Sequence, residues 1–190
     1  TASTRAAATS GWPWWRAAPQ PAECDCARRA DTAQAIAAMS MINLAIAGAG
    51  GRMGRMLLEA AGLQAGMAVS GALEHADSPL IGRDAGELVA TARGITITAD
   101  PVMSLAGASV LIDFTRPEGT LRHLAACRRQ RVNAVIGTTG FMPDQRREIE
   151  AAAADIAIVF APNMSIGVNV TLKLIDMATR ALHQHYDIEI

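Results

Sequence analysis

The sequence contains few cysteines, few aromatic residues and a single lysine, and charges of the two signs almost balance. Only three of its 190 residues are cysteine and 4% are aromatic. So few and so scattered cysteines do not make a disulfide framework, which indicates a reducing compartment, and we expect a cytoplasmic protein. The formal net charge is −1, so no nucleic-acid partner and no acidic membrane surface is indicated.

The sequence also has no long hydrophobic run and no metal-binding pattern. No apolar run approaches the roughly 18 residues that a membrane-spanning helix needs. Cys24 and Cys26 form a C-x-C pair, but no second Cys or His pair stands at zinc spacing, so we expect no metal site. Apolar residues make up 51% of the chain, which is enough for the core of one sizeable domain.

The first 40 residues differ in composition from everything after them. Small residues and prolines dominate there, all three tryptophans lie there, and no hydrophobic period is visible. We expect residues 1–40 to be a disordered or non-native leader and a compact domain to begin at Met41.

The most informative stretch is a glycine-rich turn between a strand-like and a helix-like segment. The apolar run 42–47 leads into Gly48-Ala49-Gly50-Gly51, and residues 53–63 carry apolar side chains at helical spacing. Such a turn lets the backbone approach a pyrophosphate, and the free N–H groups of the following helix face the phosphates. The spacing departs from G-x-G-x-x-G, because Met53 takes the third glycine position and Gly54 follows it. A purely structural glycine turn therefore stays open as an alternative.

A carboxylate follows the next strand-like run. Residues 67–73 are apolar or small and lead directly into Glu74, which lies about twenty residues beyond the glycines. A dinucleotide-binding fold places its ribose-binding acid at this point. The alternative without a function is that Glu74 is an ordinary surface glutamate at a strand end.

From Met41 onward, strand-like and helix-like segments alternate. This order predicts an α/β fold, a Rossmann-like parallel sheet with helices on both faces. The expected strands are 42–47, 67–73, 94–98, 109–114, 132–136 and 156–160, and the expected helices are 53–63, 101–106, 117–130 and 143–153. The long connection 75–92 is expected to be a mobile flap near the nucleotide. A further helix is expected over 168–185, and a new strand at 186–190.

Small polar residues and glycines follow three of the later strands. They are the segments 114–120, 137–140 and 161–165. In a parallel sheet, ligands bind at the carboxyl ends of the strands, so these three segments should lie along one edge and together form a site.

Four ordered motifs in the chain resemble bacterial 4-hydroxy-tetrahydrodipicolinate reductases. The motifs are AIAGAGGRMGR (45–55), IDFTRPEGT (112–120), VIGTTGF (135–141) and NMSIGVN (163–169). The resemblance covers about residues 41–190 and omits the leader.

The resemblance implies an enzyme of diaminopimelate and lysine synthesis that reduces a cyclic dicarboxylate substrate with NADPH or NADH. It implies a dinucleotide-binding domain at 41–166 and the beginning of a truncated α+β substrate and oligomerisation domain at 167–190; full-length members form tetramers. Thr139 should also lie near the substrate. The cofactor-binding positions implied by the resemblance are Gly48, Ala49, Gly50, Gly51, Arg52, Met53, Gly54, Glu74, His75, Gly137, Thr138, Thr139, Ala161, Pro162, Asn163 and Met164.

The chain departs from the family pattern in two places. The family commonly follows its ribose-binding Glu with an Arg that meets the NADP phosphate, whereas this chain has His75, a pH-dependent cation. The choice between NADH and NADPH therefore stays open, and Arg52 could still reach that phosphate. The family's His-His-Arg-His-Lys segment, which supplies the proton donor, is not in this chain. We assign no catalytic residue, and we expect His183 and His185 to be surface residues.

Two alternatives remain on the sequence alone. One is another two-domain dehydrogenase, such as one that acts on an amino-acid semialdehyde. It would need an active-site cysteine, whereas Cys127 stands among apolar residues and is expected in the core. The other alternative is a nucleotide-binding module without catalysis.

Overall fold

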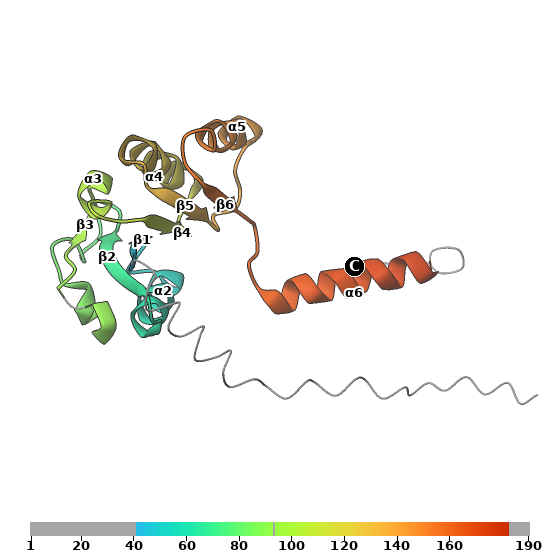
Figure 1. Ribbon diagram of the computed structural model, residues 1–190, viewed down its shortest axis with the longest axis horizontal. Coiled ribbons are helices and arrows are strands. Elements are labelled where there is room, and N and C mark those ends of the chain that lie inside the picture. The colour runs from blue at the N-terminus through green and yellow to red at the C-terminus, as the bar shows by residue number, and fades with distance from the viewer. Residues whose placement is uncertain (1–40, 93, 183–190) are drawn as a thin grey trace, which may run out of the picture. The chain divides into compact units, whose positions relative to one another are not determined.

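The structure is a computed structural model that describes residues 41–92 and 94–182 (Figure 1). The predicted leader at 1–40 and the predicted strand at 186–190 lie outside these residues. Within the described part, no helix is both long enough and apolar enough to cross a membrane.

Six parallel strands form one sheet in the order β3-β2-β1-β4-β5-β6. The strands are β1 (Ile42–Ala47), β2 (Met67–Leu73), β3 (Ile97–Thr98), β4 (Val110–Asp113), β5 (Asn133–Ile136) and β6 (Ile158–Phe160). The chain builds outward from β1 to one side and then, from β4, to the other. This reversal places a topological switch point between β1 and β4, where a sheet of this kind opens a crevice at its carboxyl edge.

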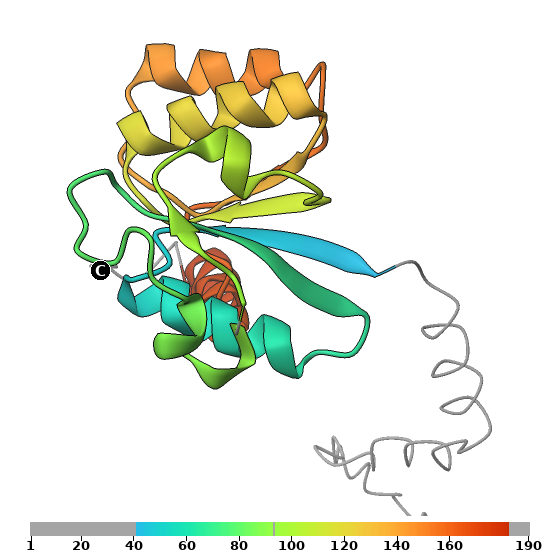
Figure 2. The same ribbon diagram turned by 90° about the vertical axis from the view of Figure 1, so that its left-hand side faces the viewer.

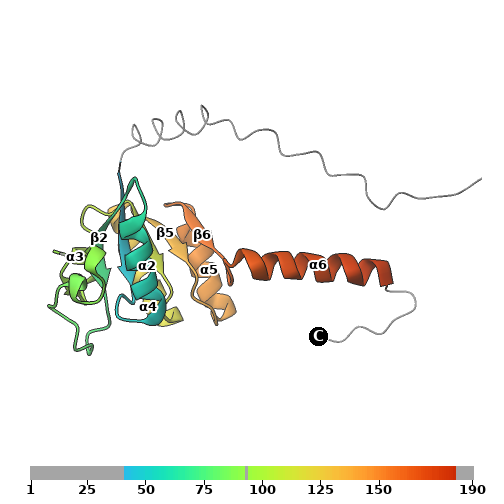
Figure 3. The same ribbon diagram turned by 90° about the horizontal axis from the view of Figure 1, so that it is seen from below.

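Helices cover both faces of the sheet, as the sequence predicted. The helices are α2 (Arg52–Leu63), α3 (Pro101–Ser104), α4 (Pro117–Gln130), α5 (Pro143–Ala152) and α6 (Ile166–Leu182), with short 3-10 turns η1 (Ala85–Glu87) and η2 (Ala90–Ala92). Figure 2 shows α4 and α5 on one face and α2 on the other. Helix α6 follows β6 as a single helix of 17 residues (Figure 3). The predicted Rossmann-like fold is confirmed.

The central strand β1 shows why both faces are buried. Its alternate residues Leu44 and Ile46 pack into a cluster with Leu58 of α2. Ala45 and Ala47 point the other way, into a cluster that includes side chains of α4 and α5. Because successive strand residues face opposite sides, an apolar residue at every position is what a strand between two helix layers requires.

The predicted strand 94–98 is wrong for its first half. Only Ile97–Thr98 pair with β2, because the backbone before them is bonded to the preceding loop. The N–H of Ala85 donates to the Ile95 carbonyl at 2.8 Å, and Asp84 and Thr96 form an antiparallel bridge. The other strand and helix ends that the structure describes differ from the predicted ones by only one or two residues.

The predicted flap at 75–92 is also wrong for its second half. Ala85 and Ala92 are buried, and the Asp84 carboxylate accepts hydrogen bonds from the N–H groups of Gly86 at 2.6 Å and Gly94 at 2.8 Å. These contacts tie residues from 83 onward to the body of the domain. The remaining part of the loop, residues 75–82, lies nearer the candidate site.

The glycine turn allows α2 to begin directly against β1. Gly48 has a φ of +70°, which favours glycine, and a Cβ placed on Gly54 would lie 2.0 Å from the Gly48 carbonyl oxygen. The turn and the first turn of the helix are therefore in backbone contact, and a side chain at 54 would push them apart.

We expect Gly54→Ala to lower the free energy of unfolding by about 3 kcal/mol, because the added methyl group meets backbone that cannot rotate away. Gly167→Ala is the matched control, since Gly167 also lies in the first turn of a helix but has only Ser165 Oγ, at 3.9 Å, near its Cβ position. The control should stay within about 0.5 kcal/mol of the wild type. Urea unfolding of both variants measures the difference, and equal effects would contradict the backbone contact.

Candidate functional site

A cleft with a volume of about 960 Å³ opens at the carboxyl edge of the sheet, at the switch point. Three segments line it, one after each of the strands β1, β2 and β4. The lining residues are Gly48, Gly50, Gly51, Leu73, Glu74, His75, Asp77, Ser78, Pro79, Leu80, Phe114, Thr115, Arg116, Glu118, Gly119, Arg122 and His123. The sequence pattern had predicted a site at this edge.

The glycine turn forms one wall of the cleft and leaves the start of α2 without a cap. The N–H groups of Gly48 and Ala49 donate to the Leu73 carbonyl at 2.8 and 3.1 Å, which fixes the turn against β2. Gly51 is the residue before the helix, and no side chain caps it. The N–H groups of the first helical turn, residues 52–54, therefore have no acceptor within the helix, an arrangement that suits an anion.

Glu74 lies directly beside this turn. Its Oε2 accepts a hydrogen bond from the Gly50 N–H at 3.3 Å, and its own N–H donates to the Thr98 carbonyl. A Cβ on Gly50 would lie 2.8 Å from Glu74 Oε2 and 2.3 Å from Leu80 Cδ1, so only glycine fits there without displacing both side chains. His75, the next residue, is exposed and lines the same cleft.

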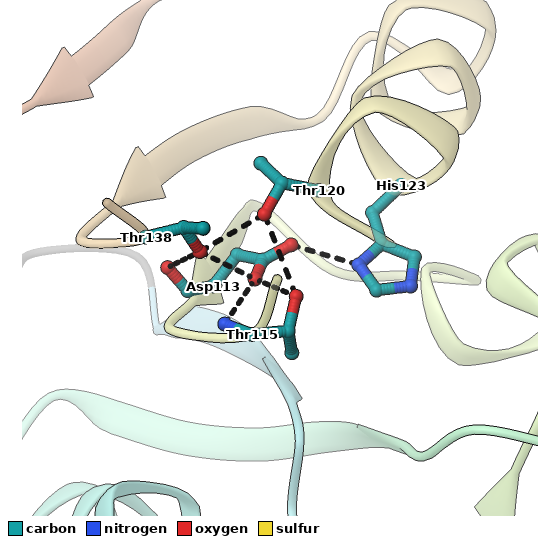
Figure 4. A network of polar contacts seen from close by, with 5 residues as sticks. All are labelled: Asp113, Thr115, Thr120, His123 and Thr138. Carbon is teal, nitrogen blue, oxygen red and sulfur yellow. Dashed lines mark hydrogen bonds and ion pairs between the residues drawn. The ribbon is translucent and has the colours of Figure 1, made fainter. Parts of the chain in front are cut away.

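A buried polar network lies behind the opposite wall, at the end of β4 (Figure 4). Asp113 is fully buried, and its Oδ1 accepts hydrogen bonds from the Thr115 N–H at 2.9 Å and from the Thr115 hydroxyl at 2.6 Å. Its Oδ2 lies 2.7 Å from His123 Nδ1. The Thr120 hydroxyl bonds that of Thr138 at 2.9 Å, which ties α4 to the segment after β5.

The network keeps Asp113 ionised. Burial by itself would raise the pKa of Asp113, but the hydrogen bond and the charge interaction with His123, together with the two bonds from Thr115, lower it below the ordinary value of 3.8. A buried carboxylate is therefore present as an anion behind the cleft at neutral pH, with His123 Nδ1 as its hydrogen-bond partner.

Comparisons with known proteins agree with this geometry. A family model described as "Dihydrodipicolinate reductase, N-terminus" matches residues 42–164. The 4-hydroxy-tetrahydrodipicolinate reductase of Nitrosospira multiformis is 55% identical over 152 residues, which cover 80% of this chain and 56% of the relative. That of Bordetella parapertussis is 60% identical over 147 residues, which cover 77% of this chain and 54% of the relative.

The chain belongs to the dihydrodipicolinate reductase family. A solved structure supports the fold as well: the dipicolinate-bound dihydrodipicolinate reductase from Paenisporosarcina sp. TG-14 matches with a TM-score of 0.61 at 25% identity, over 73% of this chain and 54% of that one. The chain spans about half the length of the curated relatives it matches. The part that matches is the nucleotide-binding domain of a reductase.

Of the residues implied by the resemblance, those that line this cleft are Gly48, Gly50, Gly51, Glu74 and His75, and the others do not line it. Arg52 and Met53 are exposed at the start of α2. Gly137 and Thr139 follow β5, and residues 161–164 follow β6, all on the same edge of the sheet and further along it.

Two of these more distant positions are explained by their contacts. A Cβ on Gly137 would lie 2.0 Å from the ring of Phe114, so glycine is needed where β5 ends beside the cleft lining. Thr138 is buried and its hydroxyl bonds Thr120, so only its backbone could face a ligand. Thr139 is exposed, and Asn163 uses its side-chain oxygen to accept from the Ser165 N–H at 2.8 Å.

The sequence interpretation placed the segment 114–120 in the site but missed three residues beside it, Asp113, Arg122 and His123. A signal was available, since Asp113 is an acid at the end of an apolar strand, where burial is costly without a partner. Thr120 and His123 stand three residues apart and so share one helix face. The sequence alone does not show that this helix face is turned toward the end of β4.

Cys127 lies in the core, as predicted. Cys127 is completely buried, with 0% of its surface accessible to solvent. Burial, and to a smaller extent the negative charge of Asp113, raises the pKa of its thiol to about 12. A thiol with this pKa stays protonated at neutral pH and is a poor nucleophile. The alternative dehydrogenase that depends on an active-site cysteine therefore has no support at this residue.

We expect Asp113→Asn to lower the free energy of unfolding at pH 7 by about 3 kcal/mol, the usual cost of breaking a buried charged pair. Because folding lowers the pKa of Asp113, its contribution is fully present above 3.8 and is lost as the pH falls below that value. The difference in the free energy of unfolding between the wild type and the variant should therefore become smaller under acid conditions. Urea unfolding at pH 7 and near pH 3 measures both quantities.

Asp155→Asn is the matched control for this experiment. Asp155 pairs with Arg128 at 2.7 Å on the surface, where such a pair is worth about 1 kcal/mol or less. If Asp113→Asn lowered the free energy of unfolding by no more than Asp155→Asn does, the network would not hold a buried anion.

Proposed function

We propose that this chain is the NAD(P)H-binding part of a 4-hydroxy-tetrahydrodipicolinate reductase, which reduces its cyclic dicarboxylate substrate to tetrahydrodipicolinate in diaminopimelate and lysine synthesis. The single observation that carries the proposal is the cleft at the switch point, where an uncapped helix start and Glu74 face the same space. The N–H groups at the start of α2 suit a pyrophosphate, and a carboxylate at the end of β2 suits the two hydroxyls of a ribose.

The sheet order suggests how the dinucleotide lies along this edge. With its adenosine ribose at Glu74 and its pyrophosphate over the turn 48–51, the nicotinamide half extends past β1 toward β4, β5 and β6. Gly137, Thr139 and Asn163 follow those strands and would serve the nicotinamide side. The bound cofactor would supply the hydride, while the protein binds it, orients it and excludes water. Thr139 is exposed and is our candidate for a contact with the substrate.

The substrate-binding part would begin at α6. No residue of this helix is buried, and its exposed apolar side chains include Val170, Leu172, Leu174 and Met177. The relatives named 4-hydroxy-tetrahydrodipicolinate reductase are nearly twice as long as the matched segment. We propose that residues from 167 onward start the substrate domain, that the full-length protein forms a homotetramer through it, and that the enzyme is cytoplasmic.

The test of the proposal is a variant that blocks the phosphate site without harming the fold. Gly51 has the extended conformation of a helix cap, and Asp is a favoured cap, although a Cβ there would lie 3.2 Å from the Gly48 carbonyl oxygen. We therefore expect Gly51→Asp to change the melting temperature by no more than about 4 °C. Its carboxylate would occupy the N–H groups that we assign to the pyrophosphate. We expect NADH and NADPH affinity, measured by calorimetry, to fall about 100-fold, since two charge-assisted hydrogen bonds are lost.

Gly51→Asn is the matched control, because it fills the same space and caps the same N–H groups without a charge. It should weaken binding less than Gly51→Asp. Dinucleotide binding that survives Gly51→Asp unchanged would remove the pyrophosphate from this turn and would overturn the proposed site.

The choice between the two cofactors depends on Glu74 and His75. The Glu74 carboxylate beside the turn favours a free ribose hydroxyl and repels a ribose phosphate, while His75 offers less positive charge than an arginine. We therefore propose limited discrimination between NADH and NADPH. His75→Arg should raise NADPH affinity about tenfold through a charge-assisted contact and leave NADH affinity within about twofold.

His75→Gln is the uncharged control and should not raise NADPH affinity. An NADPH affinity that does not respond to His75→Arg would mean that another cation, with Arg52 as the first candidate, meets the phosphate.

A further inference from the structure

We propose that His123 contacts the nicotinamide-side ribose of the bound dinucleotide and that Asp113 is the positioning residue that orients it. This inference rests on the proposed function and adds a recognition element on the β4 side of the cleft. It starts from the contrast between the two nitrogens of the His123 ring, since one faces the protein interior and the other has no assigned role.

The inner nitrogen of His123 is held firmly. Nδ1 lies 2.7 Å from Asp113 Oδ2, and Asp113 is itself bonded by the Thr115 N–H and hydroxyl. A carboxylate that accepts from Nδ1–H fixes both the orientation of the ring and the position of its proton. His123 is 7% exposed, so its surroundings also restrict the rotation of the ring.

The outer nitrogen, Nε2, is open to the cleft. His123 is among the residues that line the cleft, and Nε2 has no hydrogen-bond partner among the described residues. Within the same residues, Ser104 Oγ is the one side-chain polar atom that is fully buried without a partner. Nε2 is therefore accessible, and the accessible side is the cleft.

The position of His123 on the sheet edge indicates which part of the ligand it meets. Strand β4 lies between β1, which carries the phosphate turn, and β5, which leads to the segment 137–139. A dinucleotide that extends from the turn toward β5 has to cross the end of β4. The part of the molecule between its pyrophosphate and its nicotinamide ring is the second ribose.

The chemistry of Nε2 matches a ribose better than a phosphate. When Nδ1–H donates to Asp113, the neutral ring presents a lone pair at Nε2, which can accept a hydrogen bond. Ribose hydroxyls donate, whereas the oxygens of an ionised pyrophosphate only accept. The Asp113–His123 pair thus presents an acceptor at a point where hydroxyl groups pass.

The test uses His123→Asn and two ligands, NADH and ADP. The asparagine amide can still donate to Asp113 as Nδ1–H does, but it lacks the outer nitrogen. ADP contains the adenosine and both phosphates but not the second ribose. We expect His123→Asn to lower NADH affinity about tenfold, the loss of roughly one hydrogen bond, and to leave ADP affinity within about twofold.

Two further measurements separate a ligand contact from a merely structural role. The melting temperature of His123→Asn should stay within about 4 °C of the wild type, because the bond to Asp113 is kept. Asp113→Asn removes the carboxylate that orients the ring, so it should also lower the affinity for NADH. The ADP affinity of the folded fraction of this variant should stay unchanged.

The possible results are distinguishable. If the wild type binds NADH and His123→Asn binds it equally well, the role of His123 is wrong and the proposed function stands. If ADP affinity falls by the same factor as NADH affinity, His123 meets the pyrophosphate and the ribose assignment is wrong. If the wild type binds neither NADH nor NADPH, both this inference and the proposed function are wrong.

Discussion

The arrangement of the site depends on the backbone contact between the turn after β1 and the first turn of α2. Gly54 permits it, since a Cβ there would lie 2.0 Å from the Gly48 carbonyl oxygen. This contact places the start of α2 at the carboxyl edge of the sheet, where Gly48, Gly50 and Gly51 line the cleft. The spacing of the glycines matters less than the contact, which explains how a turn with Met53 at the third glycine position can still suit a phosphate.

A second constraint acts from the other side of β1. Asp113 ends β4 with a buried negative charge, which is tolerated because Thr115 and His123 bond to it. Through Thr120 and Thr138 the same network joins the ends of β4 and β5. The turn after β1 thus forms one wall of the cleft, and the network after β4 lies behind the opposite wall, to which it contributes Thr115 and His123.

Much of the fold could be predicted from the sequence because local signals determine it. Alternating strand-like and helix-like segments predicted the parallel sheet, and the glycine turn with Glu74 predicted one wall of the cleft at its edge. What could not be predicted depends on contacts between distant segments. The first half of the strand predicted at 94–98 is lost because Ile95 and Thr96 pair with the loop at 84–85, and the Asp113–His123 pair depends on how α4 is rotated against β4.

The central claim is that a dinucleotide lies along the carboxyl edge of the sheet, from the end of β2 to the end of β5. Mapping of backbone amide chemical shifts during titration with NADH tests it most directly. The largest changes should fall in residues 48–54, 74–75, 114–123 and 137–139. Changes confined to the arginine-rich end of α4, at residues 128–131, or no saturable change in the glycine turn, would contradict the account.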